Sequence, residues 1–196
     1  MNPNKKVDEL FAILRASEHR EYFGEAISQL EHALQTAQCA RDANAPESHI
    51  IAALLHDIGH LVGAPDEQIE GIGVIDHDEG GARYLQGLGF SEEVVDLVRG
   101  HVQAKRFLTA INAQYQSRLS PASVTTLELQ GGPMSDEEIR IFSADPRLHE
   151  KLRLRSWDEL AKRTDWVVSP LDSYRSMLVD HLESTSTSIA PLPQTV

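Results

Sequence analysis

Hydrophobic positions recur along most of the chain at the three-to-four-residue spacing of amphipathic helices. The first set consists of Val7, Leu10, Phe11 and Leu14. No segment shows the strict alternation that is typical of a strand. The most apolar segment, 50–58, has the sequence Ile-Ile-Ala-Ala-Leu-Leu-His-Asp-Ile, which predicts a buried helix with its polar groups on one stripe. We therefore expect an all-α fold organised around this segment.

Capping and turn residues mark the ends of the expected helices. Beyond the first helix, we expect helices over 25–43, over 48–62 (closed by Gly63 and Pro65), and from 77 to Gly87 or Gly89. Three further helices are expected to begin at the cap Ser91, at Ser120–Pro121 and at a Ser135/Glu138 capping box. The last two are expected over 146–162 and 170–182. Segments 17–24 and 64–76 are polar or rich in glycine and are predicted to be loops. No linker divides the chain, so we predict one domain over 1–184 and a flexible Ser/Thr/Pro-rich tail over 185–196.

The charge of the chain narrows its partners. A formal net charge of −12 over 196 residues argues against nucleic acid and anionic membrane surfaces. It does not exclude a phosphorylated small molecule, because bound metal can reverse the charge inside one pocket. The sequence contains neither a bilayer-spanning stretch nor a signal-peptide core, so we expect a cytoplasmic location.

Histidine and aspartate side chains on the apolar segments indicate a metal site. His56 and Asp57 lie on the central segment, where their burial is costly unless a metal ion compensates it. Other candidate ligands lie on separate helices or at helix starts, namely His32, His77, His101 and Asp158. Because Cys39 is the only cysteine, the ligands must be imidazole and carboxylate, which suit iron, manganese, zinc or cobalt better than calcium.

The remaining histidines are expected to play lesser parts. We expect surface or satisfied core positions for His19, His49, His149 and His181. His60 follows His56 by one helical turn, which is compatible either with a supporting role at the site or with simple packing.

The order His32, His56-Asp57, Asp158 resembles the core pattern of the HD-domain superfamily. The additional His77 and His101 resemble the subset of that superfamily that holds two metals. The resemblance implies an all-α HD-domain helical bundle around a dinuclear metal site, with Asp57 as the bridge. Two reaction classes use this scaffold: hydrolysis by a metal-activated water, and oxygen activation at two irons.

Four segments resemble the phosphonate-cleaving HD oxygenases in particular. They are Tyr22–His32, Gly100–Arg106, Leu127–Met134 and Arg155–Glu159. The resemblance extends from about Tyr22 to Tyr174 and departs at both termini and in the 61–76 loop. It implies a mixed-valence Fe(II)/Fe(III) pair, O2 as co-substrate and cleavage of a carbon–phosphorus bond without an external reductant.

The resemblance also implies a substrate with nitrogen at C2. The favoured candidate is (R)-1-hydroxy-2-(trimethylammonio)ethylphosphonate, which would yield glycine betaine and phosphate. The alternative is 2-amino-1-hydroxyethylphosphonate, which would yield glycine and phosphate. A quaternary ammonium needs aromatic or acidic surroundings, for which the candidates are Tyr22, Phe23, Phe107, Trp166 and the carboxylate of Glu25. Each aromatic could instead belong to the core.

Further site residues are carried over from the same resemblance. It implies that the phosphonate is held by His60, Lys105, Ser123 and Arg155, and that Tyr22 and Glu25 form a mobile pair at the oxygen site. Plainer interpretations are a solvated charge for Lys105, a surface ion pair for Arg155, a helix cap for Ser123 and a first-turn carboxylate for Glu25. Two other functions stay open: an HD phosphohydrolase, and a metal-dependent regulatory module without turnover.

Overall fold

The computed structural model describes residues 2–22, 24–64, 68–69 and 73–188. Its helices are α1 (Pro3–Ala16), α2 (Gln29–Asp42), α3 (Glu47–Leu55), α4 (Gly59–Val62), α5 (His77–Leu88), α6 (Glu92–Ile111), α7 (Ala113–Gln116), α8 (Pro121–Leu129), α9 (Asp136–Ser143), α10 (Leu148–Leu160), the 3-10 helix η2 (Leu171–Tyr174) and α11 (Arg175–Ser188). Two short antiparallel hairpins join β1 (Glu21–Tyr22) to β2 (Glu25–Ser28) and β3 (Gln68–Ile69) to β4 (Gly73–Val74). The all-α fold is confirmed.

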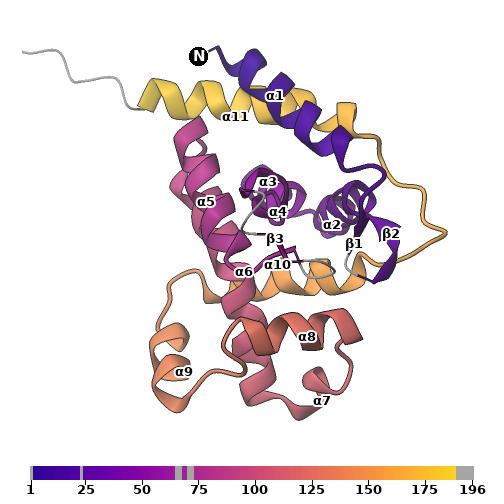
Figure 1. The fold of residues 1–196 in the computed structure, drawn as a ribbon. Coiled ribbons are helices and arrows are strands. Elements are labelled where there is room, and N and C mark those ends of the chain that lie inside the picture. Colours follow the sequence, from indigo (N-terminus) through magenta and orange to yellow (C-terminus); the bar gives the residue numbers. More distant parts are fainter. Residues whose placement is uncertain (1, 23, 65–67, 70–72, 189–196) are drawn as a thin grey trace, which may run out of the picture.

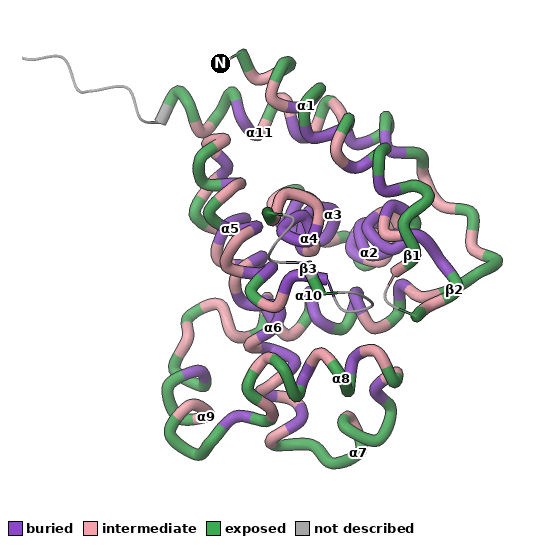
Figure 2. Tube along the Cα trace, viewed as in Figure 1, coloured by how far each residue is buried: buried purple, intermediate pink, exposed green. Residues whose placement is uncertain are grey.

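Helix α3 lies at the centre of the bundle (Figure 1). It contacts α2, α6 and α10, and the crossing pair α1 and α11 covers the side away from α10. Its residues Ile51, Leu54 and Leu55 are at most 1% exposed, and Figure 2 shows α3 as an almost continuously buried element. A helix that is apolar on nearly all sides is stable only in such a position. The described residues include no helix long and apolar enough to cross a membrane.

Helices α7, α8 and α9 form a smaller group at one end of α6, on the far side of α10 from α3 (Figure 1). A second apolar cluster joins this group to α6, with Phe107, Met134 and Phe142 all buried. The group matters for function because α8 directs Ser123 and Thr126 toward side chains of α6 and of the segment after α10.

Most helix ends agree with the capping residues. Gly89 ends α5 with φ +90°, and Ser91 accepts the N–H of Val94 at the start of α6. The Ser135/Glu138 capping box opens α9. Helix α11 continues to Ser188, past the domain boundary expected at 184, and the rest of the expected tail lies outside the described residues.

The expected absence of strands is wrong, because β2 occupies Glu25–Ser28 and β1 occupies Glu21–Tyr22. The loop expected over 17–24 is therefore confirmed for 17–20 but not for 21–22. Helix α2 begins at Gln29 rather than Glu25, because Ser28 caps it through a capping box with Glu31. The strands are too short for an alternating pattern to register in the sequence. Gly24 makes the turn between them with φ +81°.

The single helix expected over 48–62 is interrupted in the structure. Helix α3 ends at Leu55 and α4 begins at Gly59. Between them the backbone hydrogen bonds change to a three-residue spacing, from Ile58 N–H to Leu55 and from His60 N–H to Asp57. The chain tightens at the segment that carries His56 and Asp57. Pro65, expected to close the helix, lies outside the described residues, and the loop expected over 64–76 contains the β3–β4 hairpin.

Candidate metal centre

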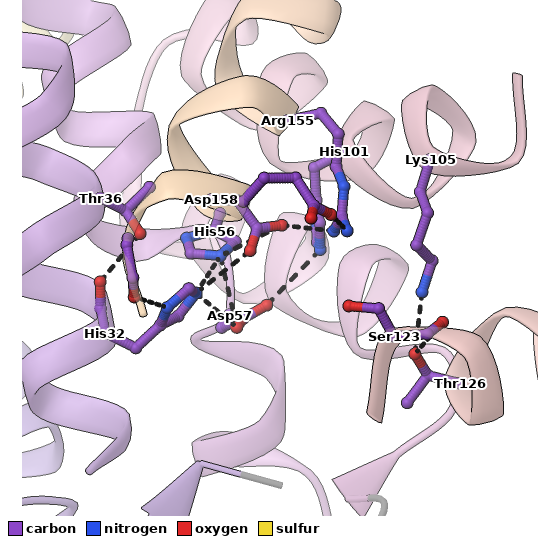
Figure 3. Close-up of polar contacts among 12 residues, drawn as sticks. His32, Thr36, His56, Asp57, His101, Lys105, Ser123, Thr126, Arg155 and Asp158 are labelled. Atoms are coloured by element: carbon purple, nitrogen blue, oxygen red, sulfur yellow. Dashed lines mark hydrogen bonds and ion pairs between the residues drawn. The ribbon is translucent and has the colours of Figure 1, made fainter. Parts of the chain in front are cut away.

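Four buried histidines form two facing pairs at the centre of the bundle. His32 on α2 and His56 after α3 bring their Nε2 atoms within 3.2 Å of each other. His77 at the start of α5 and His101 on α6 bring theirs within 3.0 Å. None of the four residues is more than 5% exposed. Elements that are far apart in sequence therefore deliver imidazoles to one small interior space (Figure 3).

The carboxylate of Asp57 lies between the two pairs. Its Oδ2 is 3.3 Å from Nε2 of His56 and 3.6 Å from Nε2 of His32. Its Oδ1 is 3.4 Å from Nε2 of His77 and 3.5 Å from Nε2 of His101. Each oxygen thus faces a different pair, as a carboxylate that bridges two ions does.

Backbone carbonyls fix the tautomer of all four imidazoles. Nδ1 lies beside the carbonyl oxygen of Ala161 for His32 (2.8 Å), Ala53 for His56 (2.9 Å), Val74 for His77 (3.0 Å) and Val98 for His101 (2.7 Å). Since a carbonyl only accepts, Nδ1 carries the proton and the neutral ring presents a lone pair at Nε2. Metal-bound histidines are oriented in the same way. Two lone pairs that face each other at 3.0–3.2 Å repel unless a cation lies between them.

Asp158 on α10 adds a second carboxylate to the first pair, with Oδ1 3.3 Å from Nε2 of His32. Within the described chain, this Oδ1 and Oδ2 of Asp57 are buried oxygens without a hydrogen-bond partner. Such oxygens beside imidazole lone pairs fit cations. One group could hold an ion through His32, His56, Asp57 and Asp158, and the other through Asp57, His77 and His101.

The charges of the site agree with this arrangement. Burial alone would raise the pKa of Asp57, but the imidazoles of His56, His101 and His77 lower it well below its usual value. Burial alone would lower the pKa of His56, but Asp57 and Asp158 raise it to about 9. These shifts favour ionised carboxylates and a positive charge beside the imidazoles, which a bound metal ion would supply.

His60 lies beside the second pair with the opposite tautomer. Its ring stacks on that of His77 with centroids 3.8 Å apart. Its Nδ1 accepts the N–H of Val74 at 3.0 Å, so the neutral ring carries its proton on Nε2. Burial and the His77 ring lower the pKa of His60 well below its usual value. His60 is thus an N–H donor rather than a lone-pair ligand, although it lies within reach of Asp57 and His77.

The β1–β2 hairpin covers the first pair. The Tyr22 ring stacks on His32 with centroids 3.8 Å apart and 15° between the planes. Burial, Asp57 and Asp158 raise the pKa of the Tyr22 phenol well above its usual value. Glu25, the strand partner of Tyr22, has its Oε1 3.5 Å from Nζ of Lys162. Glu25 therefore lies in a strand and not in the first turn of a helix.

Three of the four expected phosphonate-binding residues, all but His60, lie on or beside α8 and α10. Lys105 is 4% exposed and donates from Nζ to Oγ1 of Thr126 at 2.9 Å (Figure 3). Burial, followed by the charge of Arg155, lowers the pKa of Lys105 to about 7. The α8 cap is Ser120, whose Oγ accepts the N–H of Ser123. A solvated Lys105 and a capping role for Ser123 are therefore both wrong.

Arg155 is buried and contacts several protein groups. Its Nη1 donates to Oδ2 of Asp158 at 2.5 Å, and its Nε donates to the hydroxyl of Tyr115 at 2.9 Å. Nη2 forms an ion pair with Glu159. The surface ion pair considered for this arginine is thus wrong, since these interactions lie in the interior beside the candidate metal ligands.

The aromatic surroundings expected for an ammonium group do not assemble among the described residues. Phe107 packs on Phe142 with ring centroids 5.3 Å apart, and Trp166 lies under Arg163, whose Cζ is 4.9 Å from its ring centroid. Phe23 lies outside the described residues. Tyr22 alone of this set lies at the site, which leaves Glu25 as its acidic neighbour.

Sequence reasoning does not identify Lys162 and Thr126. Lys162 lies just past the end of α10 and donates to Ser123 and Ser120, with Nζ–Oγ distances of 3.1 and 3.3 Å. A lysine outside the periodic part of a helix has no pattern that distinguishes it from a surface charge. The one available signal is its position four residues after Asp158.

Comparisons with known proteins agree with the geometry. The family model described as HD domain matches residues 29–147. The chain is 39% identical over 183 residues to a hydroxymethylphosphonate dioxygenase of Gimesia maris, covering 92% of this chain and 90% of that protein. It is 41% identical over 150 residues to a glycine-betaine-forming [1-hydroxy-2-(trimethylamino)ethyl]phosphonate dioxygenase of Leisingera caerulea, covering 74% of each. An uncharacterised protein of Acanthamoeba polyphaga mimivirus is 34% identical over 86% of this chain and 78% of its own length.

Proposed function

This chain belongs to the HD-domain family, and we propose that it is a non-haem di-iron dioxygenase that breaks the carbon–phosphorus bond of a 1-hydroxyphosphonate with O2. The observation that carries the proposal is the position of Asp57 between two histidine pairs, with one carboxylate oxygen toward each pair. The names of two relatives, at 39% and 41% identity, support the reaction class.

An Fe(II)/Fe(III) pair would supply the redox chemistry with O2 when bound. The protein residues would hold the reactants around it. Carbonyls fix the four imidazoles, and Arg155 holds Asp158 through one oxygen so that the other faces His32. Lys105, Ser123 and His60 would direct donors at the phosphonate, and Tyr22 would exclude water from the first histidine pair until substrate arrives. The four electrons that reduce O2 come from the substrate.

The finer part of the proposal is the substrate, (R)-1-hydroxy-2-(trimethylammonio)ethylphosphonate, with glycine betaine and phosphate as products. The Leisingera relative and the carboxylate of Glu25 near Tyr22 support an ammonium group at C2. The primary amine, 2-amino-1-hydroxyethylphosphonate, would use the same carboxylate. The name of the Gimesia relative supports hydroxymethylphosphonate, which has no ammonium group, as the competing candidate.

Oxygen consumption distinguishes this function from a phosphohydrolase, which would use the same ligands to activate water. Iron-loaded protein is mixed with each of the three hydroxyphosphonates while O2 uptake and phosphate release are recorded. We expect equal amounts of O2 consumed and phosphate released, and no phosphate under argon. Phosphate release at an undiminished rate under argon would refute the dioxygenase.

A regulatory module without turnover would release no phosphate in either arm. His77→Ala, which removes a ligand from the second group, serves as the inactive control. The exposed His149→Ala serves as the matched histidine control.

A further inference from the structure

Lys162 occupies a position between the two ends of the proposed substrate site. Its Nζ lies 3.5 Å from Oε1 of Glu25 on one side and 3.1 Å from Oγ of Ser123 on the other. It also lies 6.0 Å from the centroid of the Tyr22 ring. The Lys162 side chain is only 14% exposed and that of Glu25 only 20%. The ion pair is thus largely shielded, which makes it costly to leave either charge alone.

The Ser123 side of Lys162 is rich in positive charge. Lys105 and Lys162 approach α8 from different elements, and each donates to a neutral hydroxyl there, Thr126 for Lys105 and Ser123 for Lys162. The charges of Lys162 and Arg155 both disfavour the charged form of Lys105, which places the three cations close together. The buried Lys105 and the largely shielded Lys162 have only hydroxyl partners on this helix, which favours the entry of an anion with several acceptor oxygens.

The Glu25 side has the opposite character. Glu25 is the strand partner of Tyr22, and the Tyr22 ring covers His32. A cation that replaced Lys162 beside Glu25 would therefore lie next to an aromatic ring and a carboxylate, the surroundings that suit an ammonium group. In the protein without substrate, the Lys162 ammonium is the cation that lies beside Glu25.

We propose that the Lys162–Glu25 ion pair holds the place of a zwitterionic substrate, with Lys162 as a further phosphonate-binding residue. On binding, the phosphonate forms an ion pair with the Lys162 ammonium, and the substrate ammonium forms an ion pair with the Glu25 carboxylate. The exchange breaks one ion pair and forms two, so neither protein charge is left alone. A phosphonate without an ammonium group pairs with Lys162 but leaves the Glu25 carboxylate without a cation. The inference rests on the proposed function and extends it to the charge of the substrate.

Unreactive analogues test the exchange without turnover. Iron-loaded protein is titrated calorimetrically with 2-(trimethylammonio)ethylphosphonate, which lacks the C1 hydroxyl, and with methylphosphonate, which also lacks the ammonium. We expect the wild type to bind the zwitterion about tenfold more tightly or better, since an unpaired shielded charge lowers affinity by at least that factor. Glu25→Gln should bind methylphosphonate more tightly than wild type does, because no carboxylate is stranded, and should lose the preference for the zwitterion.

Lys162→Met should weaken both analogues, and Lys162→Arg should restore most of the binding. Matched controls are Glu21→Gln, an exposed carboxylate in the same hairpin, and Arg163→Met, the neighbouring cation over Trp166. Circular dichroism and metal content identify any variant that has not folded.

The exchange is overturned if Glu25→Gln binds methylphosphonate no more tightly than wild type, or if wild type binds the two analogues equally or neither of them. Failure of the proposed function is separate, because it appears as missing O2-dependent phosphate release whatever the analogues show.

Discussion

Gly59 lies directly against the backbone of His77. A Cβ at position 59 would overlap the carbonyl oxygen of His77 and come within 2.8 Å of its Cα. Gly81 on α5 faces the same crossing, where a Cβ would lie 3.0 Å from the Gly59 nitrogen. The close approach of α4 and α5 therefore depends on glycine, and it sets the depth at which His77 enters the site.

Gly59→Ala is predicted to disturb the second histidine pair first. The added methyl group must push α5 outward and move His77 from His101, which should lower the metal content from about two ions per chain toward one and reduce the melting temperature. Metal analysis and a thermal melt measure both effects. Gly87→Ala is the control, because Gly87 lies on α5 and an added Cβ there meets no atom within 4 Å. It should leave the metal content unchanged and stabilise the protein by about 0.4–1 kcal/mol. Equal behaviour of the two variants would contradict this prediction.

The tautomers predict different outcomes at His60 and His77. His77→Ala removes a lone-pair ligand, so we expect the loss of about one ion per chain. His60→Gln keeps a side-chain N–H donor and should retain both ions while weakening phosphonate binding, because His60 presents a proton and not a lone pair. Metal analysis of the two purified variants checks the contrast. Loss of metal in His60→Gln would show that His60 is a ligand.

Arg155→Met is predicted to lower the free energy of unfolding far more in the metal-free protein than in the metal-bound protein. In the metal-free protein the change leaves the 2%-exposed Asp158 without its cationic partner, at a cost of about 3–5 kcal/mol. Bound metal would neutralise the same carboxylate, so the loss should be smaller. Urea unfolding with and without metal, with Arg153→Met on the same helix as the control, measures the difference. An equal loss in both states would argue against a metal ion beside Asp158.

Binding of a phosphonate should become weaker as the pH rises through about 7. Burial lowers the pKa of Lys105 to about 7 from an ordinary value near 10.4, so the side chain is charged below pH 7 and neutral above it. Methylphosphonate titrations between pH 6 and 8.5 should show this loss of affinity in wild type. The pH dependence that comes from Lys105 should be absent in Lys105→Met and in Lys105→Arg, which stays charged. These two variants therefore keep only the pH dependence that comes from the ionisation of methylphosphonate itself. A Lys105→Met profile identical to that of wild type would contradict the assignment.

The lowered pKa of Lys105 also determines how the stability of the folded protein changes with pH. Between about pH 7 and 10.4 the unfolded chain binds the Lys105 proton and the folded chain does not. Stability in metal-free, substrate-free protein should therefore rise with pH across this window, and the cost of burying the charged lysine is fully present below it. Denaturant unfolding of wild type and Lys105→Met over this range tests the sign.

The sequence predicts the parts of the fold that local chemistry controls. Ser91, Gly89 and the Ser135/Glu138 box mark helix ends because caps satisfy backbone groups within a few residues. The break after Leu55 is not predictable in this way. It depends on the approach of Gly59 to His77, residues 18 positions apart, which only the folded packing brings together.

The candidate ligands could be predicted because polar groups on apolar helices are costly and therefore informative. Their tautomers could not, because these depend on backbone carbonyls such as Ala161 for His32. For a similar reason, the position of Lys162 four residues after Asp158 is its only sequence signal, and that signal does not reveal what the side chain contacts. Its importance comes from the distance to Glu25, which lies in a hairpin whose strands, two and four residues long, are too short for periodicity to detect.

The hydrogen bond from His32 to Ala161 has a consequence for the order of assembly. His56, His77 and His101 each contact a carbonyl three residues earlier, so the partner of each ring belongs to the same short segment of the chain. His32 instead waits for a residue synthesised 129 positions later. The residues of the Asp57–His77–His101 half are therefore all synthesised before Asp158 and Ala161, on which the other half depends. If the protein holds two ions as proposed, the group around His32 would be ready for its ion only when the C-terminal third has docked.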